Sequence, residues 1–227
     1  MSETQTRLPV TAALAVVFLT SAASLRAVPG DEHWDAQFGA PGVTNITYAV
    51  AVNSGTVYVA GVASGGRTNA PLSVWDGKQW STAAVFTGPS TMNVNDLAFV
   101  GNTLYAAGNF TNVNGVAAYG LAKWDGTTWS SLGLTGVVYA LAVDGNNLYV
   151  GGNYTIAGGV TVTNIGCWDG SAWHALGPGV GSYAGYSVRA VAVKNGLVYA
   201  GGLFNNCGSQ LVTNLAAWDG ANWSGVG

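Results

Sequence analysis

Four copies of one short motif divide this chain into units of similar length. Each copy reads Trp-Asp-Gly, two variable residues and a second Trp, and the copies begin at intervals of 49, 44 and 50 residues, at Trp75, Trp124, Trp168 and Trp218. A second marker, the tyrosine of a short apolar run, recurs with a similar spacing at Tyr58, Tyr105, Tyr149 and Tyr199. Because self-similarity at ~40 to 50 residues marks repeat architectures, we expect one structural unit for each motif.

Each unit contains four short segments with the pattern of β-strands. In the third unit these are Val138–Val143, Leu148–Gly152, Ile165–Trp168 and a segment that begins at Trp173, and Asp144-Gly145 supplies the first tight turn. The 34 glycines among 227 residues disfavour long helices. The sequence therefore predicts an all-β fold, a β-propeller of four-stranded antiparallel blades.

The number of predicted strands does not match that of a closed ring. They span about 45–90, 91–134, 135–180 and 181–227, and residues 28–44 form an entry segment. Trp34–Gly39 in that segment resembles Trp173–Gly177, which predicts an orphan outer strand before the first repeat, although the last repeat has a fourth strand of its own. We expect either a piece of a longer protein, in which case these repeats are an incomplete ring, or an open or four-bladed ring.

The first 27 residues have the layout of a secretory signal peptide. An apolar stretch from Leu8 to Leu19 is followed by small residues, with Ala23 or Ala27 as cleavage points. An uncleaved membrane anchor over Leu8 to Leu25 is the alternative. We expect an exported protein, secreted or at the cell surface, with no stable membrane insertion after signal cleavage.

Charge and cysteine content exclude several classes of partner. The formal net charge is −3, without a run of basic residues, so nucleic acid is not an expected partner. Cys167 and Cys207 form neither a zinc pattern nor a redox motif, and a disulfide bridge between them remains open. No metal site and no cofactor is predicted.

Residues that recur in every unit are expected to hold the unit together. The aspartate of each motif should bind backbone groups of its own turn, and the tryptophans should pair across the third and fourth strands. This structural set comprises Trp75, Asp76, Trp80, Trp124, Asp125, Trp129, Trp168, Asp169, Trp173, Trp218, Asp219 and Trp223.

One position differs in chemistry from unit to unit and is the candidate ligand site. At the start of the first strand the units carry Tyr48, Asn95, Tyr139 and Arg189, and Asp96 follows in the second unit where the others have alanine. First strands line the central channel of a propeller, so these side chains could form a polar and aromatic ring at its mouth. The alternative is that they are strand ends facing solvent.

The repeats resemble those of kelch-type β-propellers, the class that includes the central domain of galactose oxidase. The resemblance covers about Thr44 to Gly227 and rests on Gly151-Gly152 and Gly201-Gly202, each followed by an aromatic-Asp pair and a downstream Trp. The first two units have Ala60-Gly61 and Ala107-Gly108 instead. The family includes both binding proteins and a copper oxidase. A copper site would need a cluster of His and Tyr ligands, and the histidines, His33 and His174, are far apart.

The sequence favours an exported, non-enzymatic propeller that acts as a binding or adhesion module, with carbohydrate or a protein at the cell surface as the partner. Whether the protein is an enzyme stays open: a glycan-active lyase or hydrolase would use Asp96 as its acid. A third hypothesis is a structural repeat segment of a larger surface protein.

Overall fold

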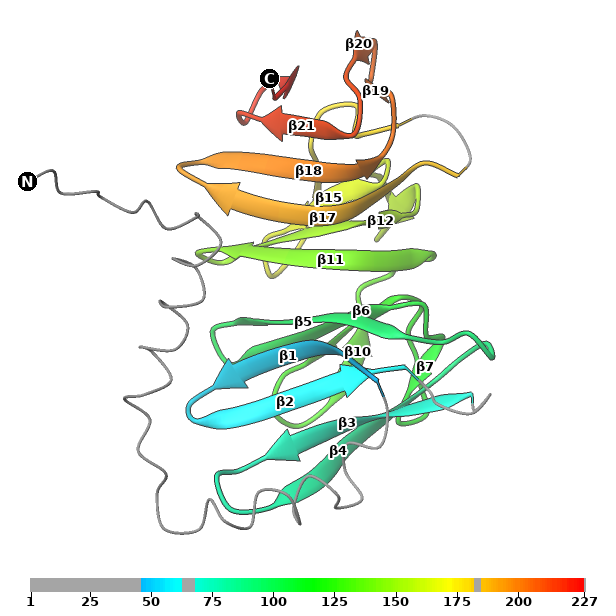
Figure 1. The fold of residues 1–227 in the computed structure, drawn as a ribbon, viewed down its shortest axis with the longest axis vertical. Coiled ribbons are helices and arrows are strands. Elements are labelled where there is room, and N and C mark those ends of the chain that lie inside the picture. Colours follow the sequence, from blue (N-terminus) through cyan, green and yellow to red (C-terminus); the bar gives the residue numbers. More distant parts are fainter. Residues whose placement is uncertain (1–45, 63–67, 182–184, 227) are drawn as a thin grey trace, which may run out of the picture. The chain divides into compact units, whose positions relative to one another are not determined.

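The computed structural model describes residues 46–62, 68–181 and 185–226 of the chain. In these residues β-strands are joined by turns, and none of them forms a helix that could cross a membrane. Four antiparallel sheets follow one another along the sequence, and we call them units I to IV (Figure 1). The prediction of an all-β fold built from four-stranded antiparallel sheets is therefore confirmed.

Within each unit the four main strands pair in chain order. Unit I contains β1 (Thr47–Asn53), β2 (Thr56–Gly61), β3 (Asn69–Trp75) and β4 (Trp80–Thr87). Unit II contains β5 (Val94–Val100), β6 (Thr103–Gly108), β9 (Leu121–Trp124) and β10 (Trp129–Ser131). Unit III contains β11 (Val137–Asp144), β12 (Asn147–Asn153), β15 (Ile165–Trp168) and β16 (Trp173–Ala175). Unit IV contains β17 (Ser187–Lys194), β18 (Leu197–Leu203), β21 (Leu215–Trp218) and β22 (Trp223–Gly225).

The polar segment between the second and third strands is a small hairpin in units II to IV. The pairs are β7 (Asn112–Val113) with β8 (Val116–Ala117), β13 (Ile156–Ala157) with β14 (Val160–Thr161), and β19 (Asn206–Cys207) with β20 (Gln210–Leu211). Each hairpin bonds to the preceding unit: β7 pairs with β4, and the Gly158 N–H donates to the Gly133 carbonyl over 3.0 Å. The hairpins therefore link neighbouring units.

A β-bulge interrupts the first strand of every unit at the same place. In unit III, Val138 pairs with Gly152 and Ala140 with Gly151, so Tyr139 is the extra residue. A Cβ atom on Gly152 would overlap the carbonyl oxygen of Val137, and the equivalent glycines of the other units, Gly61, Gly108 and Gly202, meet backbone carbonyls in the same way. The bulge thus explains why each unit needs glycine here.

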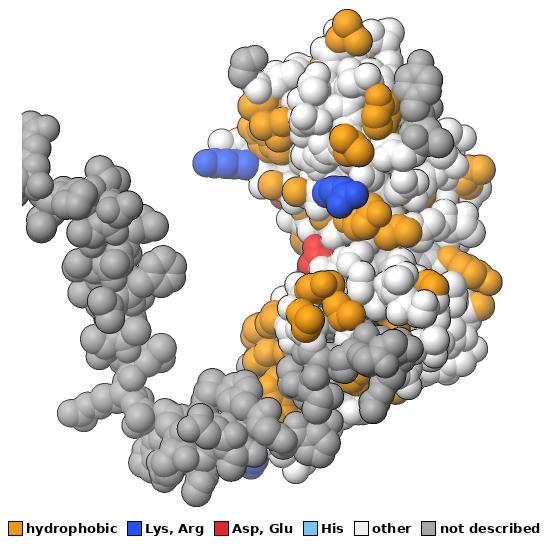
Figure 2. Space-filling model, turned by 45° about the vertical axis from the view of Figure 1, so that its right-hand side comes forward, with side chains coloured by type: hydrophobic (Ala, Val, Ile, Leu, Met, Phe, Trp, Pro, Cys, Tyr) orange, Lys and Arg blue, Asp and Glu red, His pale blue; other side chains and the backbone are white. Residues whose placement is uncertain are grey.

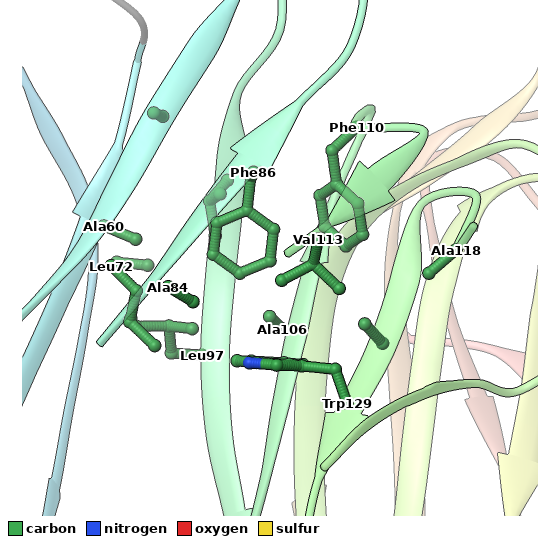
Figure 3. Close-up of a cluster of buried hydrophobic side chains, with 14 of the residues drawn as sticks. Ala60, Leu72, Ala84, Phe86, Leu97, Ala106, Phe110, Val113, Ala118 and Trp129 are labelled. Carbon is green, nitrogen blue, oxygen red and sulfur yellow. The ribbon is translucent and has the colours of Figure 1, made fainter. Parts of the chain in front are cut away.

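The hydrophobic core lies between neighbouring units. Figure 3 shows the cluster shared by units I and II, in which Leu72 of β3 and Leu97 of β5 are buried together. Phe86 of β4 packs edge-on against Trp129 of β10, with ring centroids 5.6 Å apart. Two further clusters join unit II to unit III and unit III to unit IV. Each unit therefore completes its core with residues of its neighbours.

We name the two faces of a unit by the neighbour that they contact. The front face is the one that contacts the preceding unit in units II to IV, and unit I has the same face. It carries one apolar residue of each first strand, namely Val50, Leu97, Leu141 and Val191. The back face is the one that contacts the following unit in units I to III, and unit IV has the same face. It carries one apolar residue of each third strand, namely Leu72, Leu121, Ile165 and Leu215.

The paired tryptophans close each interface between units. The two rings of each motif face each other across the third and fourth strands, with centroids 5.5 to 5.7 Å apart. The second ring also bonds to the preceding unit, since Nε1 of Trp173 donates to the Leu132 carbonyl and Nε1 of Trp223 to the Leu176 carbonyl, each over 2.8 Å. Trp173 and Trp223 therefore combine apolar burial with a satisfied indole N–H.

Several predictions fall on residues outside the described part of the chain. They are the signal peptide over 1–27, the entry segment over 28–44 with its orphan strand, and His33.

Candidate functional site

Four of the five candidate ligand-binding residues occupy the bulge position. Tyr48, Asn95, Tyr139 and Arg189 are the extra residues of β1, β5, β11 and β17. These strands are neighbours in that order, so the bulges follow one another from unit to unit, and we call the four residues the bulge row (Figure 1). Tyr48 and Arg189 are exposed and the two middle residues are half-buried. A bulge re-aims its side chain, which suits a surface that presents different chemistry in each unit.

Asn95 and Asp96 are both bonded to the first strand of unit III. Nδ2 of Asn95 donates to the carbonyl of Val138 over 2.8 Å. The two carboxylate oxygens of Asp96 accept from the N–H groups of Leu97 and Leu141, each over 2.8 Å. Burial raises the pKa of Asp96, and the two backbone bonds oppose that rise. The charge that replaces alanine in unit II thus has partners on both sides of the interface.

Tyr139 and Arg189, both in the described part of the bulge row, contact each other through their side chains. The guanidinium carbon of Arg189 lies 5.1 Å from the centroid of the Tyr139 ring, within the range of a cation–π interaction. Nε of Arg189 also donates to Oγ of Ser187 over 3.3 Å. The cation–π contact and the hydrogen bond hold the exposed guanidinium of Arg189 beside the ring of Tyr139. Its remaining N–H groups can still donate to a ligand.

The four motif aspartates each organise their own turn. Oδ1 of Asp125 accepts from the N–H groups of Thr127 and Thr128, each over 2.8 Å, and Asp76, Asp169 and Asp219 accept from their turns in the same way. The glycine that follows has a φ of 94° to 100° in all four copies, which only glycine adopts readily. The motif is therefore a turn that needs both residues.

Hydrogen bonding lowers the pKa of these four aspartates. In Asp125, Asp76 and Asp219 the largest cause is a backbone N–H of the turn, and in Asp169 it is the side chain of His174, whose Nε2 lies 2.7 Å from Oδ2. Asp76, Asp125 and Asp219 are exposed and Asp169 is partly exposed, so solvent reduces the effect on stability.

We expect stability to fall in acid because of these turns. A carboxyl whose pKa is lower in the folded state contributes stability above its unfolded pKa of about 3.9 and loses that stability as the pH falls toward the folded value. The melting temperature should therefore drop below about pH 4. Asp125→Asn should flatten this acid limb, and Asp144→Asn, outside the four turns, is the matched control. An equal effect of both substitutions would refute the assignment.

The cysteines and His174 show no arrangement typical of catalysis. Cys167 and Cys207 are buried free thiols, so the disulfide that the sequence left open is not formed, and burial raises the pKa of each to about 11. His174 is an exposed residue of β16. Among the described residues no three His, Cys, Asp or Glu side chains form a group that could hold a metal ion.

A shallow hollow lies between units I and II, away from the bulge row. Its lining includes Tyr58, Val74, Trp124 and Trp129. At the next interface Lys123 takes the strand position of Val74 and places its Nζ 5.6 Å from the centroid of the Trp168 ring. The larger residue at this position distinguishes the second interface from the first.

Two computationally designed proteins are among the solved structures to which this chain is similar. No protein-family model and no curated protein matches the chain. The crystal structure of the computationally designed Ika4 protein is 17% identical, with 78% of this chain and 93% of that chain covered and a TM-score of 0.42. The crystal structure of the computationally designed Ika8 protein is also 17% identical, with 79% of this chain and 48% of that chain covered and a TM-score of 0.45.

Proposed function

We propose that this protein is an exported, non-enzymatic β-propeller that binds carbohydrate along the bulge row. Three features support the proposal: the leader pattern of residues 1–27, the kelch-like repeat, and four-stranded units that pack face to face with their first strands adjacent. In a propeller the first strands surround the central channel, so the bulge row would lie at the mouth of that channel.

The observation that carries the proposal is the Tyr139–Arg189 pair at neighbouring bulges. An exposed guanidinium offers paired N–H donors that match a carboxylate or two adjacent hydroxyls. The exposed ring of Tyr48 adds an apolar surface at the other end of the row. A flat surface with a cation and aromatic rings suits an acidic glycan, and a surface protein that displays carboxylates is the alternative partner.

Removal of the Arg189 side chain tests this proposal. A glycan array should identify an acidic oligosaccharide, and Arg189→Ala should weaken its binding by about 10-fold or more, since a hydrogen bond to a charged group contributes about 1.5 to 3 kcal/mol. Tyr139→Ala should weaken it as well, because it removes the ring that positions the guanidinium. Lys194→Ala removes an exposed cation from the other end of β17 and should leave the affinity unchanged.

A silent glycan array together with an empty pull-down from surface proteins would contradict the proposal. Equal losses in Arg189→Ala and Lys194→Ala would contradict the assigned site, because they would show a general effect of charge.

A glycan-active enzyme with Asp96 as its acid is the second candidate, and the raised pKa of this carboxyl favours it. Both carboxylate oxygens, however, already accept backbone N–H groups that hold two units together. We therefore expect no turnover of the bound glycan by the wild-type protein. Release of product that disappears in Asp96→Asn would establish the enzyme instead.

A further inference from the structure

The front face of unit I exposes residues whose equivalents are buried in the other units. Val50 is 58% exposed, whereas Leu97 and Leu141, which take its place in units II and III, are 5% and 9% exposed. Val52, two residues along the same strand, is also exposed, and Phe99, its equivalent in unit II, packs against Tyr58 of unit I with centroids 5.1 Å apart. No described residue supplies the equivalent cover for unit I.

The back face of unit IV is uncovered in the complementary way. Leu215 is 42% exposed, while Leu121 and Ile165, its equivalents in units II and III, are fully buried. Gly201 shows the same difference: a Cβ atom on it would meet no atom closer than 3.8 Å, whereas a Cβ atom on Gly151 in unit III would lie 2.6 Å from Cγ2 of Val191. Units I to IV thus form three interfaces of this kind with one another. The front face of unit I and the back face of unit IV are the two halves of such an interface, and the described residues leave both uncovered.

We propose that a second copy of this chain covers these faces, with the front face of unit I in one copy packed on the back face of unit IV in the other. The local fit repeats an existing one, since Gly201 would meet Val50 of the second copy as Gly151 meets Val191 within the chain. Such an interface is head-to-tail, because different surfaces of the two copies meet.

The chemistry of the two faces permits this contact. Apolar residues would meet at the centre of this contact, Val50 and Val52 on one side and Ala190, Gly201 and Leu215 on the other, and the cations of β17, Arg189 and Lys194, lie toward its two ends. Unit IV has Ala190 where unit II has Asp96, so association would bury no carboxylate at this position. Figure 2 shows hydrophobic side chains exposed at several places on this view of the described residues, with few charged side chains among them. Exposed apolar surface of this kind is typical of an interaction site.

The mass of the purified full chain, by sedimentation and native mass spectrometry, tests the proposal. The wild-type chain should form a dimer or a longer head-to-tail assembly. Val50→Glu and Leu215→Glu should each be monomers, because each buries a charge at the contact. Gly201→Val should also be a monomer, and its Cβ atom would meet no atom of its own chain closer than 3.8 Å. Ile156→Glu, which places the same charge at an exposed apolar residue inside unit III, is the matched control and should assemble.

Mixing the two glutamate variants identifies the geometry. Val50→Glu keeps an intact back face and Leu215→Glu keeps an intact front face, so the mixture should form a one-to-one heterodimer although neither variant associates alone. A monomeric wild-type chain would overturn the proposal and would favour further repeats of a longer protein as the cover. Assembly that persists in both glutamate variants, or a mixture that stays monomeric, would overturn it as well.

Discussion

Replacement of Trp173 by alanine is expected to destabilise the protein by about 3 to 5 kcal/mol. The indole is buried between units II and III, and its Nε1 donates to the Leu132 carbonyl. The substitution removes a large apolar contact and leaves that carbonyl without its donor. Urea unfolding followed by circular dichroism measures the loss.

Trp80→Ala is the matched control for this prediction. Trp80 takes the same place in the motif of unit I, but it is only partly buried, because no described unit precedes it. Measured in the monomeric Leu215→Glu variant, where no second copy covers unit I, Trp80→Ala should cost clearly less than Trp173→Ala. Equal losses would show that the tryptophans act within their own unit and would contradict the core between units.

Gly108→Ala is expected to destabilise the protein by about 3 kcal/mol, at the upper end of the effects of overpacking. A Cβ atom at this position would overlap the carbonyl oxygen of Asn93, which is backbone and belongs to the chain leading into the bulge. The strand pair β5–β6 would have to shift, and the bulge that places Asn95 would shift with it. Thermal unfolding of the variant measures the loss.

Gly201→Ala is the control for Gly108→Ala, because a Cβ atom there meets ordinary van der Waals distances only. Alanine is also the residue found at the equivalent positions 60 and 107. Measured in the monomeric Val50→Glu variant, where no second copy covers Gly201, the Gly201→Ala substitution should leave stability unchanged or raise it slightly, since alanine restricts the unfolded chain more than glycine does. A large loss in this variant would contradict the open back face of unit IV.

The repeated motif predicts the strands next to it to the residue. In the third unit Ile165–Trp168 was expected as the third strand and is β15, and the fourth strand begins at Trp173 as expected; β21 and β22 of unit IV take the same places relative to their motif. The small hairpins were not expected, because strands of two residues carry no alternation. In units II to IV they bond to the preceding unit, and the sequence pattern carries no signal of such bonds.

The candidate site was predictable in its residues but not in its geometry. Variation among Tyr48, Asn95, Tyr139 and Arg189 marks the position in the sequence, yet a bulge is an irregularity of register and is visible only once the partner strand is known. The bond from Leu141 to Asp96 joins two units, so it depends on how they pack. Spacing along the chain carries no such information.

Hydrogen–deuterium exchange with and without the glycan from the array tests the central claim most directly. The proposed site predicts slower exchange at the starts of β5, β11 and β17, where Asn95, Tyr139 and Arg189 lie, and unchanged exchange at the Trp-Asp-Gly turns. Protection confined to those turns, or to the hollow lined by Tyr58 and Trp124, would contradict binding along the bulge row.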